Sequence, residues 1–158
     1  MNFQIRKAAP SDSSLIFDLI TKLSIYEKLE SEVKTSPEEL QKQIFTNKYA
    51  EVLIAEEGEI PVGFALYFFN FSTFLGKPGL YLEDLFIETE HRGKGYGKAL
   101  LTELAKIAKN KHCGRMEWSV LNWNTPSIEF YKSLGAKPMD EWSVYRLTEE
   151  KIYDLAQS

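Results

Sequence analysis

The segment Arg92-Gly93-Lys94-Gly95-Tyr96-Gly97-Lys98 decides the fold, because it joins a strand-like stretch to an amphipathic helical one. Leu80 to Ile87 before it is mostly apolar, and leucine, isoleucine and alanine recur at helical spacing from Ala99 to Ala108. Three glycines at alternate positions leave backbone N–H groups uncovered, and the helix start adds partial positive charge. The arginine and the two lysines add formal charge, so the segment is predicted to bind an anion, and a pyrophosphate is favoured over a lone carboxylate.

Other glycine-rich phosphate motifs fit this spacing poorly. A P-loop would need glycine at position 92 and Ser or Thr at position 99, where the chain has Arg92 and Ala99. A dinucleotide fingerprint would need glycine at position 98, where the chain has Lys98, and it normally follows the first strand of a βαβ unit. Taken alone, the loop is explained equally well as a flexible turn with solvated lysines.

Composition limits the function classes. A chain of 158 residues, 44% hydrophobic, predicts one folded domain over residues 1–158 with no membrane partner. The net charge of −4 argues against sequence-independent nucleic-acid binding and is compatible with a cationic small substrate. Cys113 is the only cysteine, which excludes an internal disulfide and a cysteine-rich metal site. No metal is expected. The single cysteine and the lack of a signal-peptide or lipidation pattern together favour a reducing cytoplasm.

Periodicity and turn signals predict the element order β-α-α-β-β-β-α-β-α-β, an α/β layout that begins mostly antiparallel. A loop is expected from Phe71 to Gly79, and Asn124 is expected to cap a helix that ends at Gly135. The predicted strands lie at residues 3–5, 50–56, 61–69, 80–87, 116–120 and 142–147. The predicted helices begin near residues 12, 37, 98, 125 and 149.

Four ordered motifs resemble one family, the GCN5-related N-acetyltransferases (GNAT), and within it the diamine (spermidine/spermine) acetyltransferases. The motifs are Tyr81-Leu82-Glu83-Asp84, the glycine loop, Asn124-Thr125-Pro126-Ser127 and Phe130-Tyr131. The resemblance covers nearly the whole chain. It implies the GNAT fold, a mixed, mostly antiparallel sheet of six to seven strands flanked by helices, with splayed fourth and fifth strands.

The resemblance also implies acetyl-CoA as co-substrate, with its pantetheine arm lying against the backbone of the fourth strand. The implied cofactor-binding residues are Leu85, Phe86, Ile87, Arg92, Gly93, Lys94, Gly95, Tyr96, Gly97, Lys98, Asn124, Ser127 and Tyr131.

Two catalytic residues follow from the resemblance. Glu83 occupies the general-base position and is expected to act through water, because an ordinary carboxylate is a weak direct base for an ammonium group. Tyr131 is the implied general acid or thiolate stabiliser, and the N–H of Leu85 is the implied donor to the carbonyl oxygen. Without the resemblance, Glu83 reads as a solvated strand residue and Tyr131 as part of an apolar helix face.

The implied substrate is a primary amine of a small cation, either a polyamine such as spermidine or spermine, or a lysine-like amino acid such as thialysine. The implied substrate-binding residues are Tyr26, Glu27, Glu83, Glu117, Trp118 and Ser119. A protein or peptide acetyltransferase and an acyl-CoA-binding sensor without turnover stay open. The family commonly forms homodimers whose C-terminal strands help build the active sites, so a homodimer is expected with residues 142–147 at its interface.

Overall fold

The computed structural model describes residues 2–158, and the chain divides into two compact units that meet between Ser119 and Val120. The prediction of one domain over residues 1–158 stays a prediction.

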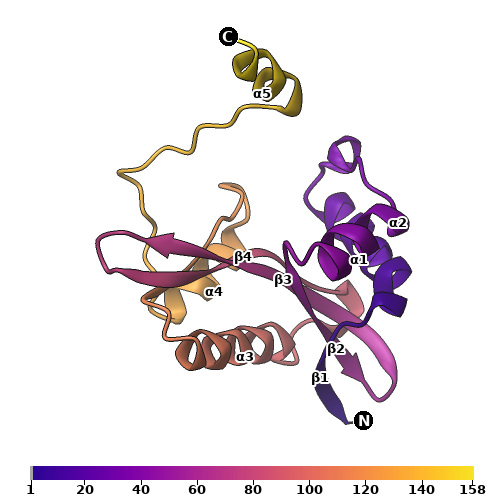
Figure 1. Ribbon diagram of the computed structural model, residues 1–158. Helices are drawn as coiled ribbons and strands as arrows, with labels where there is room; N and C mark the ends of the chain where they lie inside the picture. Colours follow the sequence, from indigo (N-terminus) through magenta and orange to yellow (C-terminus); the bar gives the residue numbers. More distant parts are fainter. Residues whose placement is uncertain (1) are drawn as a thin grey trace. The chain divides into compact units, whose positions relative to one another are not determined.

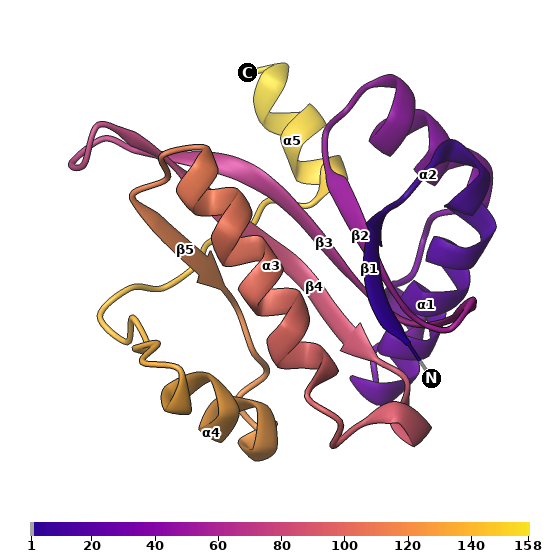
Figure 2. The same cartoon turned by 90° about the horizontal axis from the view of Figure 1, so that it is seen from below.

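The first unit is built on a five-stranded sheet in the order β1-β2-β3-β4-β5 (Figures 1 and 2). The first four strands are antiparallel, and β5 lies parallel to β4. The strands are β1 Phe3–Lys7, β2 Glu51–Glu57, β3 Ile60–Ser72, β4 Lys77–Ile87 and β5 Arg115–Trp118.

Helices cover both faces of this sheet. Helices α1 and α2 lie on one face and α3 lies across the other (Figures 1 and 2). Helix α1 places Ile16, Leu19 and Leu23 in a core cluster with Phe64 of β3 and Phe86 of β4. The helical segments of this unit are Pro10–Asp12, α1 Ser13–Tyr26, Glu30–Glu32, α2 Pro37–Leu40, a π-helical turn Gln41–Thr46, Thr89–His91 and α3 Tyr96–Asn110.

The second unit contains two helices, α4 Thr125–Ser133 and α5 Glu149–Ala156. Asn124 is the N-cap of α4, since its side chain accepts a hydrogen bond from the backbone N–H of Ser127. This cap confirms the sequence prediction. Helix α5 begins at Glu149, as predicted, and Thr148 takes the N-cap position without a side-chain capping hydrogen bond.

Two predicted elements are wrong. Phe71 to Gly79 is not a loop: β3 continues to Ser72 and β4 begins at Lys77, since Phe71 pairs with Pro78 and Asn70 with Gly79. Residues 142–147 form no strand within residues 2–158, although Trp142 and Tyr145 are suitable strand residues. A strand needs a neighbour to pair with its backbone groups, and none is present for this segment, so the sheet has five strands instead of six to seven.

Strand β4 carries a β-bulge in the middle of its length. Its pairing with β3 runs from Leu82 beside Tyr67 directly to Asp84 beside Leu66, so Glu83 is the extra residue. Bulges bend a strand and re-aim side chains, and they are common beside active sites. The bulge separates the half of β4 before Glu83 from the half after it.

Candidate functional site

The two halves of β4 differ in their pairing with β5. Gly79 to Leu82 pairs in parallel with Arg115 to Trp118, whereas Glu83 to Ile87 has no strand partner on that edge within the first unit. The other edge pairs with β3 on both sides of the bulge. The predicted separation of the fourth and fifth strands is thereby confirmed. An unpaired edge presents backbone donors and acceptors to any extended ligand that lies along it.

Three carboxyl groups gather beside this open edge. Glu83 and Asp84 come from the bulge of β4, and Glu27 follows the last residue of α1. Burial raises the pKa of Asp84 to about 7, with smaller contributions from the negative charges of Glu83 and Glu27. Burial, followed by the charge of Glu83, also raises the pKa of Glu27. Like charges crowded in a partly buried place favour a cationic ligand that would neutralise them.

The glycine loop provides an open cradle at the start of α3. Gly93 and Gly95 have left-handed φ angles of 79° and 82°, which favour glycine. A Cβ atom placed on Gly93, Gly95 or Gly97 would meet no other atom within 4 Å, so the space over the loop is free. The first N–H groups of a helix have no partner inside it. This backbone therefore fits the predicted pyrophosphate.

The Arg92 side chain turns toward the sheet and α1. Its Nε donates to the carbonyl oxygen of Ile87 at 2.9 Å, and its guanidinium lies 4.3 Å from the ring centre of Tyr26 and 5.5 Å from that of Phe86. Arg92 thus connects the glycine loop with one predicted substrate residue, Tyr26. Phe86 itself is 5% exposed, so its side chain belongs to the core.

Lys94 and Tyr96 contact a carboxylate that the sequence did not single out. Lys94 Nζ lies 3.1 Å from Oε2 of Glu57, and the Tyr96 hydroxyl donates to the same oxygen. These two hydrogen bonds, that from Tyr96 first, lower the pKa of Glu57, and the bond to Glu57 raises the pKa of Tyr96. His91 Nδ1 is buried 3.8 Å from Glu57 Oε2, too far for a hydrogen bond.

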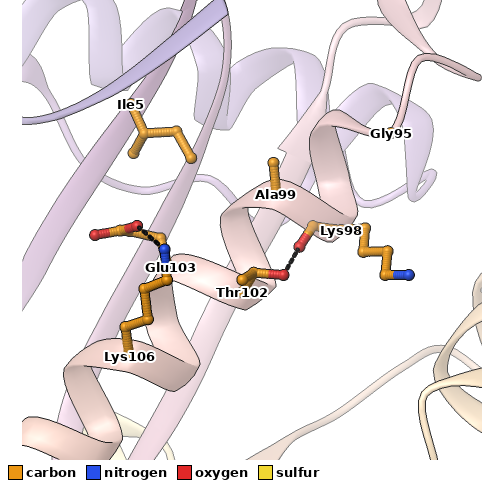
Figure 3. Close-up of a pocket in the computed structure, with 7 residues that line it drawn as sticks. All are labelled: Ile5, Gly95, Lys98, Ala99, Thr102, Glu103 and Lys106. Carbon is orange, nitrogen blue, oxygen red and sulfur yellow. Dashed lines mark hydrogen bonds and ion pairs between the residues drawn. The ribbon is translucent and has the colours of Figure 1, made fainter.

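Lys98 lies beside an open groove between Ile5 of β1 and the outer side of α3 (Figure 3). Thr102, one turn further along α3, donates to the backbone carbonyl of Lys98 at 2.8 Å. The Lys98 ammonium points away from Ile5 and makes no ion pair within residues 2–158. Of the three cations of the glycine loop, Lys94 pairs with a carboxylate and Arg92 contacts a carbonyl oxygen and two rings, whereas the Lys98 ammonium has no such contact within residues 2–158.

The predicted substrate residues of β5 lie at the end of that strand. Glu117 pairs with Tyr81 and Trp118 with Leu82 across the sheet, and Arg115 forms an ion pair with Glu117 at 3.2 Å. Ser119 follows the strand, with its Oγ 3.0 Å from the hydroxyl of Tyr81.

The predicted site residues of the second unit lie around α4. Asn124 Oδ1 is 3.4 Å from the backbone N of Ser127, so the amide oxygen caps the helix. Tyr131 lies in the second turn, and its ring centre is 5.6 Å from that of Phe130 with the planes tilted by 43°. Both Tyr131 and Ser127 are half-buried.

Sequence reasoning missed two carboxylates. Asp84 follows Glu83 inside an otherwise apolar strand, and that acidic pair was the available signal. Glu57 had no such signal, because its partners Lys94 and Tyr96 lie 37 and 39 positions further along the chain.

The described residues, 2–158, show neither a metal-binding cluster nor a membrane-spanning helix. No group of three or more His, Cys, Asp or Glu side chains is arranged to hold a metal ion. None of the described helices is long and apolar enough to cross a membrane.

Comparisons with known proteins agree with this geometry. Residues 18–136 match the model of the acetyltransferase (GNAT) family. The chain is 35% identical over 164 residues to thialysine N-epsilon-acetyltransferase of Sus scrofa, covering 96% of each protein. An integron cassette protein from the mobile metagenome of V. cholerae has a TM-score of 0.83 at 29% identity and covers 100% of this chain and 99% of its own. A predicted acetyltransferase of Clostridium acetobutylicum, solved with acetyl-CoA, has a TM-score of 0.76 at 25% identity, covering 92% and 97%.

Proposed function

The chain belongs to the GNAT family of acetyltransferases, and from this membership we propose that it acetylates a primary amine of a small cationic substrate with acetyl-CoA. The observation that carries the substrate class is the carboxyl cluster of Glu27, Glu83 and Asp84 beside the open half of β4. A protonated amine that enters this cluster relieves the repulsion between the carboxylates. Polyamines and lysine-like amino acids, the two predicted substrate classes, both carry a protonated primary amine.

Acetyl-CoA as co-substrate is supported by the family and by the shape of two backbone segments. The open edge of β4 from Glu83 to Ile87 suits the pantetheine arm, and the cradle of Gly93, Gly95 and Gly97 suits the pyrophosphate. Lys98 supplies a free positive charge beside that cradle. Asn124 and Ser127 are proposed near the pantetheine arm from the resemblance alone.

The proposed chemistry is a direct attack of the amine on a thioester, which acetyl-CoA supplies. An aliphatic ammonium has a pKa of about 10, so its proton must leave first, and Glu83 accepts it through water. The N–C bond then forms while the backbone N–H of Leu85 stabilises the charge on the carbonyl oxygen. As the C–S bond breaks, Tyr131 gives its proton to the departing sulfur.

Two substrate classes are proposed side by side. The relative from Sus scrofa is named for thialysine, which favours a lysine-like amino acid. The motifs resemble the diamine branch, which favours a polyamine. Tyr26, Glu117, Trp118 and Ser119 are proposed to contact the rest of the amine. Peptide amines are the competing class.

A mass-spectrometric acetylation screen over polyamines, amino acids and peptides tests this proposal. We expect turnover of a free diamine or lysine-like amino acid that outpaces every peptide. Preferred peptides would overturn the substrate class, and acetyl-CoA binding without turnover of any amine would favour a sensor. Tyr131→Phe should lose most turnover while still binding acetyl-CoA, and undiminished activity would remove Tyr131 from the mechanism.

We also propose that residues 1–158 act as one domain, as a homodimer in the cytoplasm. The single Cys113 supports a reducing compartment, and the family resemblance supports the dimer. Sedimentation of the purified protein checks the oligomeric state.

A further inference from the structure

Glu57 is placed where a carboxylate needs several donors. It is the last residue of β2 and is 7% exposed, and the turn residue Gly58 follows it. Its Oε2 accepts from the Tyr96 hydroxyl and from Lys94 Nζ. Both donors belong to the glycine loop, so one carboxylate ties this loop to the end of the sheet.

Tyr96 is held on a second side. Its ring stacks on that of Phe3 in β1, with centres 4.1 Å apart and planes 10° apart. Tyr96 is also the first residue of α3, directly after the left-handed Gly95. Contacts that fix Tyr96 therefore fix the direction in which the first N–H groups of α3 point.

Two of the three positively charged side chains of the loop make contacts within the protein. Lys94 faces Glu57, and the Arg92 guanidinium is occupied by Ile87, Tyr26 and Phe86. Backbone N–H groups and Lys98 are left to face a ligand. A cradle of backbone donors works only if the backbone is held in the right shape before binding.

We propose that Glu57 is a positioning residue that braces the glycine loop through Tyr96 and Lys94, so that the backbone from Gly93 to Lys98 is preorganised for the pyrophosphate of acetyl-CoA. This inference rests on the proposed function. It makes Lys94 a part of the brace and leaves the pyrophosphate to the backbone and to Lys98.

Glu57 could also weaken binding of the pyrophosphate, which is the opposite of bracing. A carboxylate beside a phosphate site repels the phosphate, so if repulsion dominated, removal of Glu57 would tighten binding. The ion pair with Lys94 offsets that repulsion, because the positive charge of Lys94 largely cancels the negative charge of Glu57. Bracing therefore predicts weaker binding on removal, and the sign of the change separates the two effects.

The test compares Glu57→Ala and Glu57→Gln with the control Glu59→Ala, which removes one exposed negative charge from the neighbouring turn. Calorimetric titration with acetyl-CoA should give a Kd raised about tenfold in Glu57→Ala, and a smaller rise in Glu57→Gln, which keeps an oxygen acceptor for Tyr96. Glu59→Ala should stay within twofold of wild type. Lys94→Met should raise the Kd less than Glu57→Ala.

Two further readouts separate bracing from a general loss of structure. Hydrogen exchange of the free protein should speed up in residues 93–98 of Glu57→Ala and stay unchanged in α1. The KM for S-acetylpantetheine, which has no pyrophosphate, should stay within twofold while the KM for acetyl-CoA rises.

Several outcomes would overturn the proposal. Tighter binding in both Glu57 variants would mean that repulsion dominates, and equal rises of both KM values would mean a merely structural role. Binding and exchange as in wild type would mean that Glu57 does not brace the loop. Wild-type protein that fails to bind acetyl-CoA would overturn the proposed function itself, and this failure is seen before any variant is made.

Discussion

Asp84 is half-buried and Glu57 is buried in the same sheet, and the charges that surround these two carboxyl groups are of opposite sign. Asp84 lies near Glu83 and Glu27, and burial with these negative neighbours raises its pKa to about 7. Glu57 accepts from Tyr96 and Lys94, and these donors lower its pKa. Burial alone therefore does not determine how a carboxyl group titrates; its neighbours do.

This difference distinguishes a carboxylate whose partners come from the protein from a carboxyl cluster that has room for a cationic ligand. The donors of Glu57 come from the protein, so its role is internal. Within residues 2–158 no Lys or Arg forms an ion pair with Glu27, Glu83 or Asp84, so a cation from solution would complete that cluster. Perturbed carboxyl groups of this kind are common in functional sites.

The largest expected effect is on catalysis by the acidic cluster. Glu83→Gln keeps the shape of the side chain and removes its basicity, so kcat should fall about a hundredfold. The acidic limb of the pH–rate profile should move as well. Steady-state kinetics from pH 5 to 9 measure both, with Glu90→Gln as the exposed control. An unchanged profile would point to another base.

Asp84→Asn should have the next largest effect, on amine binding. A cation prefers ionised Asp84, so the wild-type enzyme should bind amine more tightly as pH rises through about 7. The variant should lack this step and have a KM for amine about tenfold higher at pH 8. Kinetics with the amine at several pH values test this, and a step that survives in the variant would belong to another group.

The same substitution should stabilise the fold at high pH. The pKa of Asp84 is raised from 3.8 to about 7 in the folded protein, so ionisation costs stability as pH rises between these values. Asp84→Asn removes that cost. Relative to wild type, its free energy of unfolding should therefore be about 1 to 3 kcal/mol more favourable at pH 8 than at pH 4. Urea unfolding at both pH values measures the gain.

Arg92 connects the glycine loop with the end of α1, and its replacement should have an intermediate effect on the free energy of unfolding. Arg92→Met removes the contact with the Tyr26 ring and the hydrogen bond to Ile87. The free energy of unfolding should fall by about 1 to 2 kcal/mol. Arg146→Met, at an exposed position of the second unit, is the matched control in thermal or urea unfolding. Equal stability of the two variants would mean that Arg92 does not tie the loop to α1.

The smallest expected effect concerns acid stability at Glu57. A lowered pKa contributes stability above the ordinary value of 4.5, and this contribution is lost as pH falls below it. Glu57→Gln should therefore flatten the decline in stability between pH 5 and pH 3. A decline as steep as that of wild type would assign acid sensitivity to other groups, with Asp12 beside Arg6 as the first candidate.

Local patterns predicted the elements that contain their own signals. The amphipathic run behind α3 and the Asn124 cap of α4 can each be read within a few residues. The strand predicted at residues 142–147 failed because a strand depends on a partner elsewhere. The contact of Glu57 with Lys94 depends in the same way on distant pairing, so no short window contains it. The assignment of Glu27 and Tyr131 came from the family resemblance, which carries long-range information that periodicity lacks.

The bulge at Glu83 also makes the length of β4 matter more than its composition. Leu82 and Phe86 are four positions apart and would share a face in a regular strand, yet Leu82 pairs with Tyr67 and Phe86 with Phe64, which lie on opposite faces of β3. The extra residue thus changes the parity of the strand. Deleting it would turn Phe86 to the opposite face of the sheet, away from the cluster with α1, whereas substituting it would not. The number of residues in β4 therefore decides which face of the sheet Phe86 occupies, while the side chain at position 83 is left to its proposed catalytic role.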